Sequence, residues 1–249
     1  ELLVAALRDA DPVLRRCRIE GEEATGDMAR FSTDSELAIA IDPIDGTKQY
    51  RDRSGNGYSI IVHLHNQTDP IYSLVFAPEM GEHGTWVEVE ASRIVCGPDN
   101  PDVPARTILD ALPDLRHDRS QRGNGIYLIG FQDLDTQRAR EVDALGLTGR
   151  TSDEMPGSIY PFMATGAYAG SLIHSPNIYD FPVSMQIARV LGGDAVWCHT
   201  RQPVHYRELW MDDRAGMLRF PAVVACSEDR SIIDQLCDLA KDWPLERYR

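Results

Sequence analysis

The sequence lacks any long hydrophobic run. No apolar stretch approaches the roughly 20 residues that a helix needs to cross a bilayer. Residues 1–20 include Asp9, Asp11, Arg15 and Arg16 in place of the apolar core of a signal peptide. We therefore expect no membrane partner and no targeting segment in this stretch, and a cytoplasmic location.

Basic residues are also scarce. The chain has 25 lysines and arginines against 39 aspartates and glutamates, which gives a formal net charge of −14. Proteins that bind the phosphate backbone of nucleic acids need a basic face. The charge balance thus argues against a nucleic-acid polymer as partner. An excess of acidic residues is typical of a solvated acidic surface, or of sites at which carboxylates bind cations.

Cysteines are few and scattered. The five cysteines form no Cys-x-x-Cys pair and no cluster with the spacing of a zinc site. Their odd number and wide separation are typical of free thiols in a reducing compartment. They are Cys17, Cys96, Cys198, Cys226 and Cys237.

The chain nevertheless has what a large globular core requires. Its 249 residues are 43% hydrophobic and 26% charged, which fits one large domain or two closely packed halves. Residues 1–100 are predicted to form an α+β half with an antiparallel sheet, and residues 101–249 an α/β half, with the boundary in the linker-like stretch 98–105. The strands expected in the first half are 36–41, 58–64, 71–76 and 85–89. The second half alternates strands (125–130, 171–174, 194–198, 221–226) with helices (135–145, 157–168, 180–191, 229–241).

The most informative motif is DPIDGT at residues 42–47, directly after an expected buried strand. Two carboxylates, Asp42 and Asp45, lie three residues apart on a turn stiffened by proline, and Mg²⁺ prefers such oxygen ligands. Gly46 permits close approach of the backbone to a ligand, and a helix starting at Gly46 or Thr47 would offer N–H groups to an anion. Metals beside an anion cradle suggest phosphoryl chemistry. An ordinary β-turn explains the hexapeptide equally well when it is taken alone.

Three further sequence elements are candidates for the same site as the DPIDGT motif. Glu22 lies in Gly21-Glu22-Glu23, whose simpler interpretation is an exposed acidic loop. Asp180 precedes an expected helix, where an aspartate is a common N-cap without further function. Ser158, after Gly157, is either another N-cap or a substrate contact.

Taken together and in this order, the three acidic elements resemble the inositol monophosphatase superfamily of Mg²⁺-dependent, lithium-sensitive phosphomonoesterases. The resemblance covers roughly residues 20 to 240. It implies a layered αβαβα sandwich of the sugar-phosphatase type and hydrolysis of a small phosphorylated substrate. Members are often dimers, so a homodimer is expected.

The resemblance also implies a role for each matching residue. Glu22, Asp42 and the carbonyl of Ile44 would bind one Mg²⁺, and Asp42, Asp45 and Asp180 a second. Glu22 and Thr47 would orient and deprotonate the attacking water, so that Glu22, Thr47 and Asp45 form the catalytic set. Gly46, Thr47 and Ser158 would contact the substrate. Two or three Mg²⁺ ions are expected, with Mn²⁺ as a substitute.

Several departures leave the substrate open. The Thr-x-x-Asp element near the family's third metal site is not found in the twenty residues before Gly21. Thr47-Lys48-Gln49-Tyr50 resembles bisphosphate nucleotidases and histidinol-phosphatases, although the lysine that nucleotidases carry after Gly-Ser is missing. Arg51 and Arg53 either hold a second phosphate or lie on a solvated turn. Substrates considered are inositol phosphate, 3'-phosphoadenosine-5'-phosphate, histidinol phosphate and sugar bisphosphates. A non-catalytic, metal-dependent ligand-binding protein is the alternative of another class.

Overall fold

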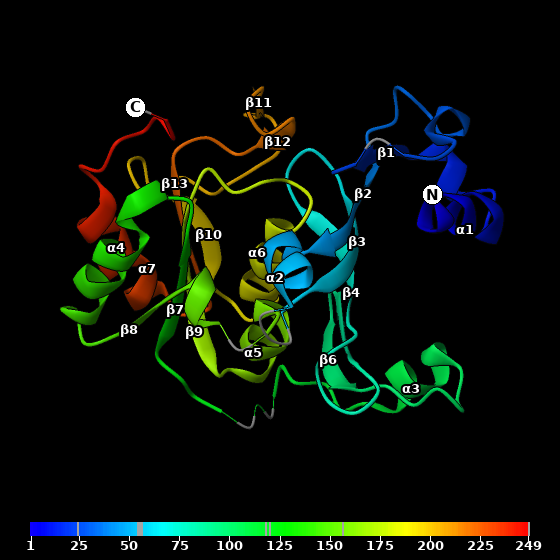
Figure 1. Cartoon of the computed structure of the whole chain (residues 1–249), viewed down its shortest axis with the longest axis horizontal. Helices are drawn as coiled ribbons and strands as arrows, with labels where there is room; N and C mark the ends of the chain where they lie inside the picture. The colour runs from blue at the N-terminus through cyan, green and yellow to red at the C-terminus, as the bar shows by residue number, and fades with distance from the viewer. Residues whose placement is uncertain (24, 54–56, 118, 120, 156, 249) are drawn as a thin grey trace.

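The computed structural model describes residues 1–23, 25–53, 57–117, 119, 121–155 and 157–248. Figure 1 shows two sheets with helices between and outside them. No helix in these ranges is long and apolar enough to cross a membrane.

The first sheet has the strand order β1-β2-β3-β4-β5-β6. Its strands pair antiparallel except β1 and β2, which run parallel. Their bounds are β1 Arg18–Gly21, β2 Ala38–Asp45, β3 Ser59–His65, β4 Pro70–Ala77, β5 Thr85–Glu90 and β6 Arg93–Pro98.

The second sheet has the order β10-β13-β9-β7-β8 and mixes both pairings. Strand β7 runs parallel to β8 and β9, whereas β13 is antiparallel to β9 and β10. A separate hairpin, β11 and β12, follows β10. The bounds are β7 Gly125–Ile129, β8 Thr148–Thr151, β9 Tyr168–His174, β10 Asp194–Trp197, β11 Trp210–Asp212, β12 Met217–Arg219 and β13 Val223–Ser227.

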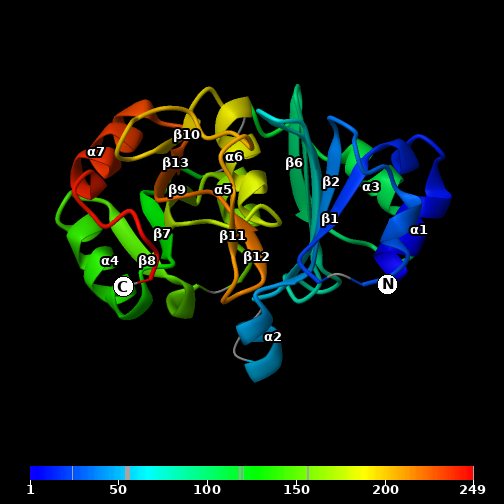
Figure 2. The ribbon, with the colours of Figure 1, turned by 90° about the horizontal axis from the view of Figure 1, so that it is seen from above.

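Helices separate and cover the sheets, as Figure 2 shows from above. Helices α5 and α6 lie between the two sheets, α4 and α7 cover the outer face of the second, and α1 packs on the outer face of the first. The layers therefore run αβαβα. The helices are α1 Leu2–Ala10, α2 Thr47–Asp52, α3 Ala105–Ala111, α4 Asp135–Asp143, α5 Ile159–Thr165, α6 Phe181–Val190 and α7 Arg230–Ala240.

The central core lies between the sheets. Helix α6 is buried along most of its length, with Phe181, Val183, Met185 and Ile187 in the core, because it contacts both sheets. A helix buried all round belongs in such a layer between two sheets. In β2 the side chains alternate: Ala40 faces this core, and Ile41 faces α1. The α/β class and the layered architecture predicted from the sequence are confirmed.

The main differences concern short elements. Strand β1 was not predicted, and its parallel pairing with β2 departs from the antiparallel sheet expected in the first half. Strand β6 and helix α3 flank and shorten the stretch 98–105 that was interpreted as a linker. Strand β2 also continues to Asp45, so the DPID residues belong to the strand and do not follow it. The division at residue 100 into two halves stays a prediction.

One buried histidine links the layers. His63 of β3 has no exposed surface, and its Nε2 donates a hydrogen bond to the carbonyl of Ile178 at 2.8 Å. Among the described residues Nδ1 has no partner. Burial, with a smaller contribution from the nearby His65, lowers the pKa of His63 to about 3.

This lowered pKa predicts a loss of stability in acid. Between pH 6.5 and 3 an unfolded chain binds a proton at His63 that the folded chain does not, so the free energy of unfolding falls as pH falls. His63→Gln lacks this titration. From pH 7 to pH 4 the wild type should lose about 3 kcal/mol more than the variant, as measured by urea unfolding. His83→Gln, at an exposed histidine, should keep the wild-type profile, and parallel curves for all three proteins would contradict the assignment.

Candidate active site

A β-bulge aims the two aspartates of the DPIDGT motif in the same direction. Asp42 pairs with Ile61 and Asp45 with Ser59, so the register shifts between them by one extra residue in β2. In a regular strand, residues three apart point to opposite faces. The bulge turns Asp45 back to the inner face on which Asp42 lies, because it inserts one unpaired residue.

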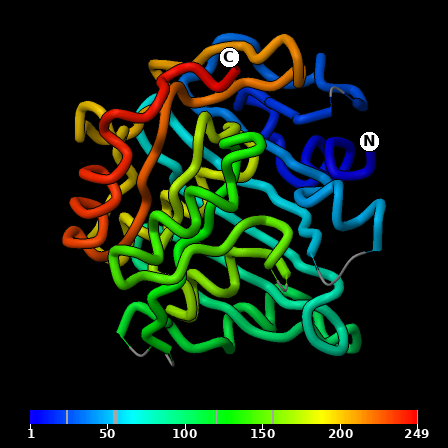
Figure 3. The backbone as a smooth tube through the Cα atoms, turned by 60° about the vertical axis from the view of Figure 1, so that its left-hand side comes forward, coloured from blue at the N-terminus to red at the C-terminus, as the bar shows by residue number. Residues whose placement is uncertain are grey.

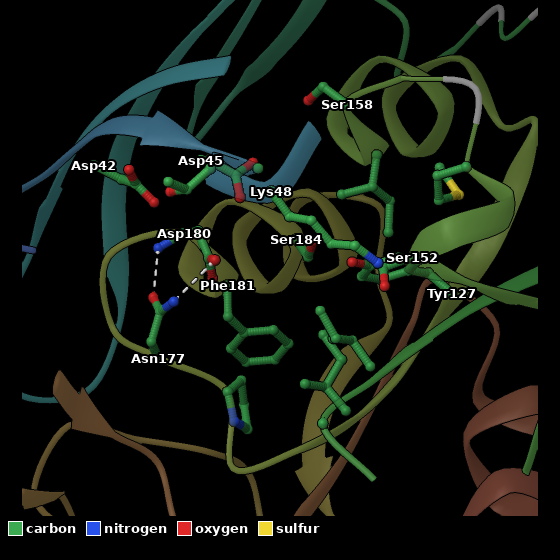
Figure 4. Close-up of a pocket in the computed structure, with 18 of the residues that line it drawn as sticks. Asp42, Asp45, Lys48, Tyr127, Ser152, Ser158, Asn177, Asp180, Phe181 and Ser184 are labelled. Carbon is green, nitrogen blue, oxygen red and sulfur yellow. Dashed lines mark hydrogen bonds between the residues drawn. The ribbon is translucent and has the colours of Figure 1, made fainter. Parts of the chain in front are cut away.

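Both aspartates line a cavity of about 310 Å³ between the sheets. Asp180, at the N-terminus of α6, lines it from the other half of the chain. Figure 4 shows the three carboxylates near one another, with Lys48 extending past them and Ser158 at one side. Glu22, directly after β1, lines the same cavity.

The three aspartates form a cluster of ligand size. One carboxylate oxygen from each of Asp42, Asp45 and Asp180 lies within 4.8 Å of the others. Asp42 is 2% exposed, and the other two are half-buried. Asp42 accepts a hydrogen bond from the amide of Ile44 at 3.0 Å, and Asp45 accepts one from Ser59 Oγ at 2.9 Å.

Asp180 is held in place by Asn177. The Nδ2 of Asn177 donates to Asp180 Oδ2 at 2.9 Å, and its Oδ1 accepts from the amide of Asp180 at 3.0 Å. Figure 4 marks both bonds. The side chain of Asp180 makes no N-cap hydrogen bond to α6, which argues against the simple capping role considered for it.

Crowding of these carboxylates disfavours their charged forms. Burial, then the charges of Asp45 and Glu22, raises the pKa of Asp42 to about 11. Burial raises the pKa of Asp45 to about 6, against the lowering effect of its bond from Ser59. The pKa values of Glu22 and Asp180 are also raised, in each case chiefly by burial.

The donor set fits a hard divalent cation. Within the described ranges no basic side chain forms an ion pair with Glu22, Asp42, Asp45 or Asp180, and the three aspartates each bring one oxygen into the same cluster. Mg²⁺ accepts carboxylate oxygens in this kind of arrangement and would balance their repulsion. The carbonyl of Ile44 accepts one hydrogen bond, from Thr47 Oγ1 at 3.0 Å, which leaves one lone pair available.

The remaining predicted site residues also line this cavity. Gly46 has a φ of +86° and precedes α2, whose first residue is Thr47. Ser158 is buried before α5, and its Oγ donates to Ser59 Oγ at 3.3 Å. The structure thus brings all eight predicted site residues together, while their roles in binding and catalysis stay predictions. Those residues are Glu22, Asp42, Ile44, Asp45, Gly46, Thr47, Ser158 and Asp180.

Sequence reasoning missed other residues of the site. Ser59 lies in β3, and no sequence pattern around it marks it as a site residue. Asn177 could have been noticed, because an asparagine three residues before an aspartate at a helix start is typical of an Asx turn. Arg219 and Arg247 also line the cavity, although neither belongs to a motif.

Comparisons with known proteins identify the fold. No protein-family model and no curated protein sequence matches the chain. Among solved structures, it is similar to the inositol monophosphatase of Anabaena (Nostoc) sp. PCC 7120, with a TM-score of 0.64 and 16% identity over 98% of this chain and 84% of that chain. It is also similar to CysQ from Bacteroides thetaiotaomicron, a bacterial member of the inositol monophosphatase family, with a TM-score of 0.62 and 16% identity over 91% and 81% of the two chains.

A third similar structure was solved with a bound ion. It is an IMPase/NADP phosphatase complexed with Mg²⁺ and phosphate, with a TM-score of 0.62 and 14% identity over 100% of this chain and 81% of that chain. The chain therefore has the fold of the inositol monophosphatase family. The resemblance predicted from the three acidic elements is confirmed at the level of the fold.

Gly46 provides a test of the local geometry. A Cβ at this position would lie 2.5 Å from the carbonyl oxygen of Gly57, in addition to the strain of a positive φ. Gly192 also has a positive φ, of +95°, but open space around it. Gly192→Ala therefore measures the backbone strain without a steric contact. We expect Gly192→Ala to cost about 1 kcal/mol and Gly46→Ala at least about 3 kcal/mol in urea unfolding. Equal losses would show that the contact with Gly57 does not constrain the turn.

Proposed function

We propose that this protein is a Mg²⁺-dependent phosphatase that hydrolyses a small phosphate monoester. The observation that carries the proposal is the convergence of carboxylates from two distant parts of the chain, Asp42 and Asp45 from β2 and Asp180 from α6, within 4.8 Å in one cavity. The fold shared with phosphatases of the inositol monophosphatase family supports it.

The bound cations would supply the electrophilic chemistry, because Mg²⁺ neutralises phosphate charge and lowers the pKa of water. Asp42, Asp45, Asp180, Glu22 and the carbonyl of Ile44 would hold them. The number of ions, two or three, and the substitution by Mn²⁺ belong to the same proposal.

The chain's own residues would position the attacking water. Thr47 Oγ1 donates its proton to the carbonyl of Ile44, so its oxygen lone pairs can only accept from a water. Burial raises the pKa of Glu22, and a raised pKa makes its carboxylate a stronger base towards a water. The amides of Gly46 and Thr47, and Ser158, would contact the substrate.

A cavity of about 310 Å³ suits a small substrate such as an inositol phosphate or a nucleotide bisphosphate. Histidinol phosphate and sugar bisphosphates are the alternatives. A metal-dependent binding protein without catalysis is the rival of another class.

Replacing one metal ligand tests the site. Asp42→Asn should reduce turnover at least about 100-fold, since it removes a direct metal ligand. It should not lower the melting temperature without Mg²⁺, because the raised pKa keeps Asp42 protonated there and the variant replaces a neutral carboxyl group by a neutral amide of similar shape. The rise in melting temperature on adding Mg²⁺ should shrink. Phosphate release and thermal melts measure these effects. Asp52→Asn, an exposed aspartate on α2, is the control, and wild-type turnover in Asp42→Asn would refute the assignment.

A substrate panel tests the reaction. Phosphate release should be measured from inositol-1-phosphate, 3'-phosphoadenosine-5'-phosphate, histidinol phosphate and fructose-1,6-bisphosphate, with and without Mg²⁺ and with added Li⁺. We expect Mg²⁺-dependent release from at least one compound, suppressed by Li⁺. No release from any of them, with Mg²⁺ binding intact by calorimetry, would favour the non-catalytic binding protein.

A further inference from the structure

Two arginines from the C-terminal part of the chain line the same cavity as the carboxylates. Arg219 is the last residue of β12, and Arg247 lies in the tail that follows α7. Figure 3 shows this tail, in red, returning beside the orange segment that contains β11 and β12. Arg247 reaches the ends of β7 and β9, where its Nη1 donates to the carbonyl of His174.

The charge of Arg219 is matched by the protein. This arginine is buried, and its Nε donates to Asp212 Oδ2 at 2.7 Å. Its Nη1 donates to the carbonyl of Ser175 at 3.1 Å. The hydroxyl of Tyr248 donates to the same oxygen of Asp212 at 2.8 Å, so one carboxylate anchors both the hairpin and the tail.

The charge of Arg247 is not matched in this way. In the part of the chain that the structure describes, no carboxylate forms an ion pair with it, and its buried Nε has no hydrogen-bond partner. Burial, followed by repulsion from Arg219, lowers its pKa. Asp135 and Asp212 act on it only from beyond ion-pair distance. A half-buried guanidinium without a paired carboxylate is unfavourable, and an anion placed beside it would reduce that cost.

Lys48 is the other cation at the cavity, and it differs from Arg247. Its ammonium pairs with the carboxylate of Asp153, across the cavity from α2 to the segment before α5. Lys48 is exposed to solvent and already paired, so the half-buried, unpaired Arg247 is the cation that gains most from an anionic ligand.

We propose that Arg247 binds a second anionic group on the leaving-group side of the substrate, so that the enzyme prefers phosphate monoesters bearing a further phosphate or carboxylate. This proposal rests on the phosphatase function proposed above. The carboxylate cluster with its cations would hold the scissile phosphate, and one continuous cavity leads from it to Arg247. A guanidinium forms paired, charge-assisted hydrogen bonds with phosphate and carboxylate groups.

Matched pairs of substrates test the role proposed for Arg247. Each pair differs by one anionic group: glycerol 3-phosphate and 3-phosphoglycerate, fructose 1-phosphate and fructose 1,6-bisphosphate, adenosine 3'-phosphate and adenosine 3',5'-bisphosphate. In the wild type, kcat/KM should be at least about tenfold higher for the member with two anionic groups, and Arg247→Gln should reduce this ratio about tenfold.

Arg214→Gln is the matched control. The guanidinium of Arg214 lies 4.4 Å from the ring centroid of Tyr248, and that of Arg247 lies 5.8 Å from it, but Arg214 is exposed and does not line the cavity. Arg214→Gln removes the same charge from the β11–β12 hairpin, on which the tail packs, and the ratio should stay at its wild-type value. A wild-type ratio near one, or equal losses for both members of every pair in Arg247→Gln, would overturn the proposal.

A binding measurement separates this proposal from the phosphatase function. If none of the six compounds is hydrolysed, thermal melts with Mg²⁺ and each compound replace the kinetics. A larger rise in melting temperature from the compounds with two anionic groups, lost in Arg247→Gln and kept in Arg214→Gln, would support the anion site although hydrolysis had failed. No rise in the wild type, or the same rise in all three proteins, would refute it.

Discussion

Repulsion among carboxylates is the interaction around which this structure is organised. Asp42, Asp45 and Asp180 approach within 4.8 Å in a cavity between the two sheets, and no basic side chain of the described ranges pairs with them. Such a cluster is stable only when protons or cations balance its charge, and its raised pKa values express that requirement. The surrounding fold has to supply the free energy that holds these groups together.

Helix α6 supplies much of this support because it is packed between the sheets. Gln186 accepts a hydrogen bond from Ser73 Oγ at 2.6 Å and donates to the carbonyl of Val89 at 3.1 Å, which ties the helix to β4 and β5. His63 of β3 binds the carbonyl of Ile178 just before the helix. These polar contacts are buried, so breaking them would leave unsatisfied groups. They fix the N-terminus of α6, and with it Asp180, opposite the end of β2.

The sequence was sufficient to predict the layers and the acidic core of the site, for definable reasons. Long periodic segments such as α6 and α7, and the strands around residues 60, 74 and 87, carry strong hydrophobic patterns. Strand β1 has only four half-buried residues, and therefore no clear alternation. The DPIDGT motif pointed to Asp42 and Asp45, but their common orientation depends on a bulge that pairing with β3 creates.

Residues of the site without a motif could not be predicted in the same way. Arg247 reaches the cavity only because the tail after α7 folds back on the β11–β12 hairpin, held there by the bond from Tyr248 to Asp212. Ser59 acts through its position opposite Asp45 in the sheet. Such positions follow from tertiary packing, and local sequence contains no pattern that specifies them.

The distribution of charge within the cavity has a consequence for the order of binding. The chain carries a net charge of −14, so an anionic substrate approaching it meets repulsion that is screened beyond about 8–10 Å in physiological salt. Nearer the cavity, metal-free carboxylates repel a phosphate where they are ionised, and offer it no positive charge where they are protonated. Cations bound at Asp42, Asp45 and Asp180 would make the local charge positive. Arg247 would then attract the second anionic group at the other end of the cavity. The electrostatics of the site therefore favour a sequence in which the metal ions bind first and the substrate follows.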